Sequence, residues 1–165
     1  MPMYYVPSTN QYLREGVAFE LNAVQYPANW LALASADEKA ALGLQEVIAT
    51  GPRPDDRYYW VTEQLQGATL SYVATPKDLT ALKTQCTATV KQCAYSLLLP
   101  TDYMAVRAVE SGLPMPEEWK TWRGNVRACA SSATTAVENA ATVERLMQIM
   151  AEITWPTDPA HEVAA

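Results

Sequence analysis

The hydrophobic pattern of the chain changes its period near residue 75, and this change limits the folds open to it. Before that point, apolar and polar residues alternate in short segments between turn residues, as in Val17–Leu21, which is typical of strands. After it, apolar residues recur every three or four positions, which is typical of helices. The sequence therefore predicts an α+β fold. We expect a small β-rich N-terminal module over residues 1–74, a helical region over residues 75–158 with a connecting helix and a C-terminal helical hairpin bundle, and a loose tail over residues 159–165.

The N-terminal module should consist of short strands around one small core. Ser35 and Glu38 have the spacing of a capping box, which predicts a short helix after the first strands. Gln66-Gly67 predicts a tight turn between the last two strands. The predicted core residues are Val17, Phe19, Leu21, Trp30, Leu31 and Leu33. The predicted strands are Met3–Val6, Gln11–Arg14, Val17–Leu21, Val24–Tyr26, Leu44–Ile48, Arg57–Glu63 and Ala68–Ala74.

The connecting helix should begin with Thr75 as its cap and Pro76 in its first turn, and run to about Leu99. Its apolar residues repeat with the spacing of a coiled coil. Two arrangements are open: this stripe packs against the helices that follow, or it joins two copies of the chain. The stripe, within residues 79–97, consists of Leu79, Leu82, Cys86, Val90, Cys93 and Leu97.

The segment Thr101–Arg127 reads as two helices joined at a proline-rich elbow. Thr101 or Asp102 can cap the first helix, and Gly112 can end it. Pro116 suits the first position of the second helix. The second helix should carry one apolar stripe, formed by Trp119, Trp122, Val126 and Cys129.

Arg123 and Arg127 lie beside this stripe, and two interpretations of the elbow compete. In the first, the elbow is a core in which the Arg stems pack on Trp and the guanidinium groups pair with Glu110 or Glu118. In the second, the Trp and Arg side chains form a partner-binding surface, because these residue types anchor many interfaces.

The order of residues in the elbow resembles the pattern of tailed-phage tail fibre assembly chaperones and related small tail proteins. The matching residues are Asp102-Tyr103, Arg107, Glu110, Trp122-Arg123, Arg127 and, near the C-terminus, Trp155-Pro156. The long Ala/Ser/Thr run after Arg127 departs from that pattern. The partner-binding residues expected from the pattern and from the elbow itself are Asp102, Tyr103, Arg107, Trp119, Trp122, Arg123, Arg127 and Trp155.

The resemblance implies a protein that acts in the host cytoplasm by contact with a tail fibre or other tail protein, helping it to fold, trimerise or attach. A structural component that stays bound to the fibre or baseplate in the virion tail is the first alternative. A regulatory or DNA-associated phage protein is the second. The net charge of −6 and the lack of a basic stripe argue against nucleic acid as a partner.

The sequence offers few residues for catalysis. Its single His, His161, is near the C-terminus, and no glycine-rich phosphate loop is present. Cys86 and Cys93 are seven apart on one predicted helix, too far to bridge, and no CxxC pair suggests zinc. We therefore expect no enzymatic activity, metal or cofactor. The N-terminus lacks the pattern of a signal peptide, and no apolar run approaches the ~20 residues of a membrane span.

Overall fold

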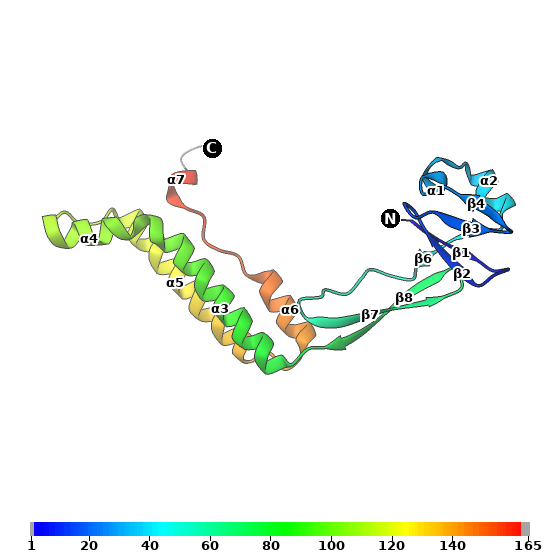
Figure 1. The fold of residues 1–165 in the computed structure, drawn as a ribbon. Helices are drawn as coiled ribbons and strands as arrows, with labels where there is room; N and C mark the ends of the chain where they lie inside the picture. Colours follow the sequence, from blue (N-terminus) through cyan, green and yellow to red (C-terminus); the bar gives the residue numbers. More distant parts are fainter. Residues whose placement is uncertain (1, 163–165) are drawn as a thin grey trace. The chain divides into compact units, whose positions relative to one another are not determined.

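A computed structural model describes residues 2–162 and shows an α+β fold, as the sequence predicts (Figure 1). The chain divides into two compact units, one up to Thr75 and the other from Pro76 onward. The predicted boundary lies one residue earlier. The first unit holds the sheets and the second holds the long helices, so the change of hydrophobic period coincides with a change of architecture.

Three short strands form the first sheet, with β1 (Met3–Val6) between β2 (Gln11–Arg14) and β5 (Gln45–Glu46). Both neighbours run antiparallel to β1. Alternate residues of the strands face the core of the unit, because successive side chains of a strand point to opposite sides. Tyr4 and Val6 are buried on this side.

A tight hairpin of β3 (Phe19–Leu21) and β4 (Val24–Tyr26) completes this core. Asn22 and Ala23 form its turn, both with positive φ (53° and 61°), as a type I′ turn requires. Tyr26 stacks on Phe19 with ring centroids 4.8 Å apart. Phe19 and Leu21 also share one hydrophobic cluster with Tyr4 and Val6 of β1, which packs the hairpin against the buried face of the sheet.

Two of the predicted core residues in this unit are exposed. Val17 is 57% exposed and lies outside β3, which begins at Phe19 and not at Val17 as predicted; its amide donates to the Arg14 carbonyl at 3.3 Å in the turn after β2. Leu33 ends the single turn α1 (Trp30–Leu33) and is 77% exposed, whereas Leu31 on the same turn is buried. A one-turn helix buries one side only, so residues two apart on it cannot both face the core.

The helix α2 (Ala36–Ala41) begins with the predicted capping box. The Glu38 carboxylate accepts from the Ser35 amide at 2.7 Å, and the Glu38 amide donates to the Ser35 hydroxyl at 3.3 Å. Lys39, in the last turn, donates to the Tyr4 hydroxyl at 3.1 Å. This last bond attaches α2 to β1 and so to the first sheet.

The predicted strand Leu44–Ile48 is wrong, because this stretch is shared between two sheets. Its first part, β5, pairs with β1, and the Val47 amide donates to the Met3 carbonyl at 2.8 Å. Its second part, β6 (Ile48–Ala49), runs parallel to the start of β8. One continuous segment therefore changes partners at Val47.

The second sheet has the order β6-β8-β7 and is built on a long hairpin of β7 (Tyr59–Gln66) and β8 (Thr69–Pro76). β7 begins two residues later and ends three residues later than the predicted strand Arg57–Glu63. β8 begins one residue later and ends two residues later than the predicted strand Ala68–Ala74. Gly67 in the hairpin turn has φ +57°, and a Cβ there would lie 3.7 Å from the Tyr5 ring. This end of the hairpin therefore packs close to the first sheet.

The second unit is a helical bundle in which α3 (Leu79–Leu98) and α6 (Val143–Glu152) both pack on α5 (Glu117–Glu138). Thr75 does not cap α3, because β8 continues through Pro76. Asp78 caps it instead, accepting from the Ala81 amide at 2.7 Å. Thr142 caps α6, its hydroxyl accepting from the Arg145 amide at 3.2 Å.

The predicted stripe of α3 contributes to the bundle through Leu82, Cys86 and Val90, which are buried. Cys93 is exposed, and Ala94 takes the next buried position. The stripe thus packs within one chain, on α5 and α6. Its pairing with a second copy stays a prediction. In the predicted tail, residues 159–162 form the single turn α7 (Pro159–Glu162), and residues 163–165 lie outside the described residues, as does Met1 of the predicted β module.

Candidate partner-binding surface

The elbow joins α3 to α5 through a short 3-10 turn, η1 (Leu99–Thr101), and the helix α4 (Asp102–Ser111). Pro100 lies in η1, where its missing amide hydrogen changes the direction of the chain. Gly112 ends α4 with φ +67°, the left-handed conformation that glycine adopts without strain. The elbow therefore has the predicted two-helix form.

Arg123 of α5 holds the elbow together from inside. Its side chain is buried, and Nη1 donates to the Leu98 carbonyl at 2.9 Å and also to the Thr101 hydroxyl. Nη2 donates to the Asp102 carboxylate at 2.6 Å. A planar guanidinium can bind acceptors in several directions at once, so one side chain fixes the end of α3, η1 and the start of α4.

The elbow differs from the sequence prediction in its ion pair and in its cap. Arg123 pairs with Asp102 and not with Glu110 or Glu118. Neither Thr101 nor Asp102 caps α4 with its side chain. Both side chains serve Arg123 instead, and the Thr101 hydroxyl also donates to the Leu98 carbonyl at 2.8 Å.

Trp122 lies beside Arg123 and is 5% exposed. Its indole Nε1–H donates to the Pro156 carbonyl at 3.1 Å, which attaches the segment after α6 to α5. Trp119 makes an edge contact with Trp122, with ring centroids 5.7 Å apart. The residues of this cluster are Ala94, Leu97, Leu98, Trp119, Trp122, Val126, Ala130 and Trp155.

The eight predicted partner-binding residues therefore fall into two groups. Trp122 and Arg123 are buried within their own chain, whereas Trp119, Trp155 and Asp102 are half-buried and contribute to the same packing. The remaining residues, Tyr103, Arg107 and Arg127, are exposed. The three Trp residues share one cluster, Arg123 binds Asp102, and Tyr103 and Arg107 line a hollow together. Only the exposed group offers most of its surface to another molecule.

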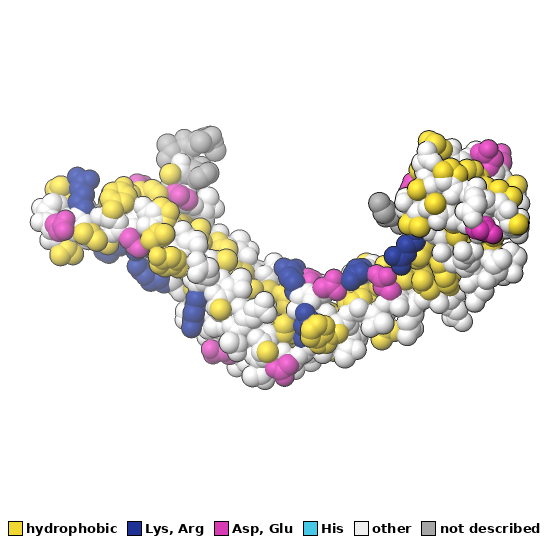
Figure 2. Space-filling view, viewed as in Figure 1, with side chains coloured by type: hydrophobic (Ala, Val, Ile, Leu, Met, Phe, Trp, Pro, Cys, Tyr) yellow, Lys and Arg dark blue, Asp and Glu magenta, His cyan; other side chains and the backbone are white. Residues whose placement is uncertain are grey.

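The helix α4 itself buries none of its side chains. Four apolar residues of α4 and of the loop after it form what we call the exposed face of α4: Tyr103, Val106, Val109 and Leu113. Val109 is 86% exposed, the highest value among the large apolar residues that are exposed. Figure 2 shows hydrophobic side chains gathered over α4 and the adjoining end of α3. Sequence reasoning missed Val109 and Leu113. Val109 lies three residues after Val106, a spacing that marks one side of a helix, whereas Leu113 lies beyond the end of α4, after Gly112.

Two shallow hollows flank the loop between α4 and α5, and they share Met115. The first has a volume of about 290 Å³ and is largely apolar, with Arg107 as its one charged residue. The second has a volume of about 320 Å³ and lies between α4 and α5. We call the second the basic hollow. It is lined by Ala105, Ala108, Met115, Lys120, Arg123 and Arg127.

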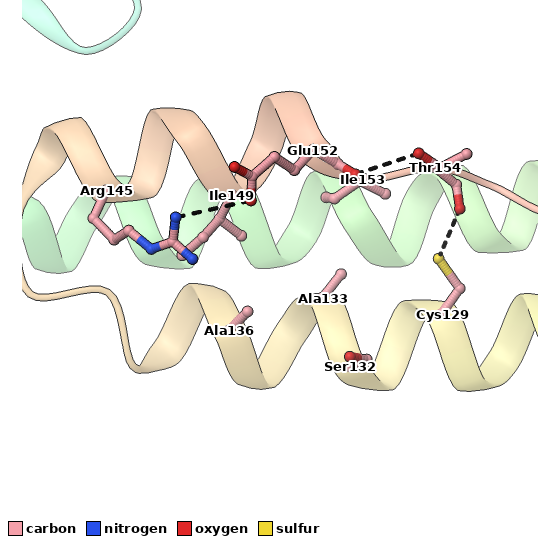
Figure 3. A pocket seen from close by; sticks show the side chains of 9 residues that line it. All are labelled: Cys129, Ser132, Ala133, Ala136, Arg145, Ile149, Glu152, Ile153 and Thr154. Atoms are coloured by element: carbon pink, nitrogen blue, oxygen red, sulfur yellow. Dashed lines mark hydrogen bonds and ion pairs between the residues drawn. The ribbon is translucent and has the colours of Figure 1, made fainter.

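A third hollow, of about 260 Å³, lies between α5 and α6 (Figure 3). Arg145 and Glu152 of α6 form an ion pair of 3.8 Å at its edge, and both are more than half exposed. The Cys129 thiol donates to the Thr154 carbonyl at 3.5 Å. Small residues of α5, such as Ala133 and Ala136, form its floor. This geometry is that of a packing gap between two helices with small side chains.

Within the described part of the chain, no three His, Cys, Asp or Glu side chains lie close enough together to hold a metal ion. None of the helices between residues 2 and 162 is both long and apolar enough to cross a membrane.

Comparison with known proteins gives no relative. The chain matches no protein-family model, and it has no significant match among curated proteins or among solved structures.

Proposed function

We propose that the protein is a phage tail assembly protein that acts by contact, helping a tail fibre protein to fold, trimerise or attach, without catalysing a reaction. The resemblance of the elbow residues to the tail fibre assembly pattern supports the biological setting. The structural observation that carries the contact role is the exposed face of α4, because this helix buries no side chain in its own chain.

A short helix with no buried face needs a reason to exist. Isolated helices shorter than ~12–15 residues are marginal in water, and most helices in proteins are stabilised by packing of an apolar side. In α4 the outward side carries Val106 and Val109, which remain exposed. Arg123 and Gly112 hold the two ends of α4 in place, so the helix is presented in a fixed conformation without being covered.

Such a surface suits a transient partner. A fibre chain exposes apolar segments and unpaired strand edges before it trimerises, and these aggregate. The exposed face of α4 could cover one of these segments, and the net charge of −6 would keep the complex soluble. Covering an exposed valine side chain contributes roughly 1 kcal/mol or more, which is enough for several such residues to hold a weak complex.

The test is co-expression of a tail fibre gene of the same phage with and without this chain. We expect the chain to raise the yield of soluble fibre trimer and to co-purify with the fibre protein. The double variant Val106→Ser/Val109→Ser should lose both effects at an unchanged melting temperature. The control Val24→Ser changes an exposed valine of the first unit and should behave like the wild type.

Equal yields of fibre trimer with and without the chain, together with no co-purification, would contradict the proposal. Mass spectrometry of purified particles separates the two modes of action. Absence of the chain from the particle fits an assembly factor that leaves, whereas its presence fits the alternative of a structural component that stays in the virion tail.

A further inference from the structure

The side chains that line the basic hollow carry positive charge, whereas the whole chain is negatively charged. Lys120, Arg123 and Arg127 follow one another along one side of α5 at spacings of three and four residues, and all three line the hollow. None of the described residues that line it is Asp or Glu. In a chain with a net charge of −6, the lining of this hollow is therefore positive, and the acids that pair with Lys120 and Arg123, Glu117 and Asp102, lie outside it.

Two of these cations have charge available for a partner. Arg127 has no ion pair within residues 2–162, and Lys120 has only a 3.5 Å contact with Glu117 in which both side chains are highly exposed. Such an exposed pair holds its members weakly. Arg123 differs, because Asp102 compensates its charge.

Arg123 nevertheless keeps one donor for the hollow. Its Nη1 and Nη2 atoms make all of its hydrogen bonds, to Leu98, Thr101 and Asp102. No buried side-chain nitrogen or oxygen of the described residues lacks a hydrogen bond, so the remaining Nε–H is accessible from outside. It adds a fixed donor beside the two mobile cations, and carboxylates bind well to such charged donors.

The other wall of the hollow is apolar. Ala105 and Ala108 come from α4 and Met115 from the loop, and the exposed face of α4 continues from the same helix. A free ion would leave this apolar wall uncovered. A nucleic acid would meet the repulsion of the net negative charge and would not cover exposed valines. A polypeptide segment with an acid next to aliphatic residues matches both walls.

We propose that the basic hollow receives an Asp or Glu side chain of the partner protein, flanked by aliphatic residues that cover Ala105, Ala108 and the exposed face of α4. The inference rests on the proposed function, since it names the chemistry of the partner at the same surface. Lys120 and Arg127 provide the charge, and Arg123 provides an oriented N–H.

The first experiment measures binding of the fibre protein to charge-reversal variants. Arg127→Glu and Lys120→Glu should each weaken binding by about tenfold at low salt, because each replaces attraction by repulsion at the interface. The control Lys91→Glu makes the same change at an exposed lysine of α3 and should stay within about twofold of the wild type. Raising the salt concentration should weaken the complex of the fibre protein with the wild-type chain more than its complex with the Arg127→Glu variant, because the variant has less attraction for salt to screen. Arg127→Gln and Lys120→Gln give milder changes should a reversal disturb folding.

The second experiment identifies the acid. Short overlapping peptides of the fibre protein are tested for binding, and the binding peptide should contain Asp or Glu beside aliphatic residues. Replacing that Asp or Glu of the peptide by Asn or Gln should weaken binding of the peptide to the wild-type chain. The same peptide change should have a smaller effect on Arg127→Gln, because one of the interactions of the acid is already removed while those with Lys120 and Arg123 remain.

The outcomes separate this inference from the proposed function. Fibre binding that is equally strong in Arg127→Glu, Lys120→Glu and Lys91→Glu would overturn the acidic-segment inference and leave the contact role intact. A wild-type chain that binds no fibre protein would overturn both. A short DNA duplex that binds the wild type and not Arg127→Glu would assign the hollow to phosphate and overturn the inference as well.

Discussion

The Arg123 guanidinium binds the Asp102 carboxylate at 2.6 Å although 21 positions separate the two residues in the chain. Arg123 is buried and Asp102 is half-exposed, so the pair connects the interior of the second unit to the start of α4. The same guanidinium binds the last carbonyl of α3, at Leu98. The direction in which α4 leaves the bundle therefore depends on one side chain.

Replacing Arg123 by Ala should destabilise the second unit by about 2–3 kcal/mol, because it leaves the Leu98 carbonyl and the Thr101 hydroxyl without their charged donor. Arg123→Lys should recover only part of this, since an ammonium cannot reproduce the planar set of donors. Urea unfolding measures both. Arg127→Ala is the matched control on an exposed arginine of the same helix, and a loss as large as that of Arg123→Ala would contradict this account.

Trp122→Phe should destabilise the same unit by about 1–2 kcal/mol and free the segment after α6, because the Pro156 carbonyl loses the indole donor. Hydrogen exchange should quicken over residues 153–158. Trp119→Phe is the control, a half-buried Trp of the same cluster. Equal exchange over this segment in the two variants would show that the indole hydrogen bond is unimportant.

Ala23→Gly should stabilise the first unit by roughly 1 kcal/mol. Ala23 adopts φ +61° in the turn between β3 and β4, a conformation that costs an L-residue roughly that amount and that glycine adopts freely. The change also produces Asn-Gly, the preferred pair of a type I′ turn. Thermal unfolding should show a higher melting temperature, whereas Ala23→Val should lower it.

The capping box of α2 should make the first unit slightly less stable in acid. The Glu38 carboxylate accepts from the Ser35 amide, and this bond, followed by that of the Ser35 hydroxyl, holds the pKa of Glu38 below its ordinary value of 4.5. A lowered pKa in the folded state means that the contribution is complete above the unfolded value and is lost as the pH falls through the folded value. Glu38→Gln should therefore lower the melting temperature at neutral pH and have a smaller effect below pH 4.5. An equal effect at both pH values would argue against the charged form of the cap.

Limited proteolysis should cut the chain first in the loop at residues 51–56 or near Pro76–Asp78, where β8 ends and α3 has not begun. Protease sites are preferred in exposed segments outside regular structure. Mass spectrometry of the early fragments gives the cut sites. Early cleavage within residues 81–97 would contradict a stable α3.

Local signals allowed much of the fold to be predicted from the sequence. The capping box at Ser35 and Glu38 and the Gln66-Gly67 turn each depend on residues within a few positions, where residue type decides the backbone conformation. The change of hydrophobic period marks the two architectures for the same reason.

Pairings between distant residues could not be predicted in this way. The sequence near Arg123 contains Glu118 as an acid, yet Asp102 is the partner, because η1 turns the chain back toward α5. The exposure of Val109 was also unpredictable, since a helical spacing shows which residues share a side and not whether another element covers it.

The change of partners at Val47 couples the two three-stranded sheets, β2-β1-β5 and β6-β8-β7. Gln45–Glu46 is an edge of one sheet and Ile48–Ala49 an edge of the other, so one opening of this segment exposes an edge of both. Native-state hydrogen exchange should then give the Val47 and Ile48 amides the same opening free energy, although Met3, the acceptor of the first, is in β1 and Ala68, the acceptor of the second, is in the turn before β8. The two sheets would open as one cooperative unit because a single stretch of backbone belongs to each.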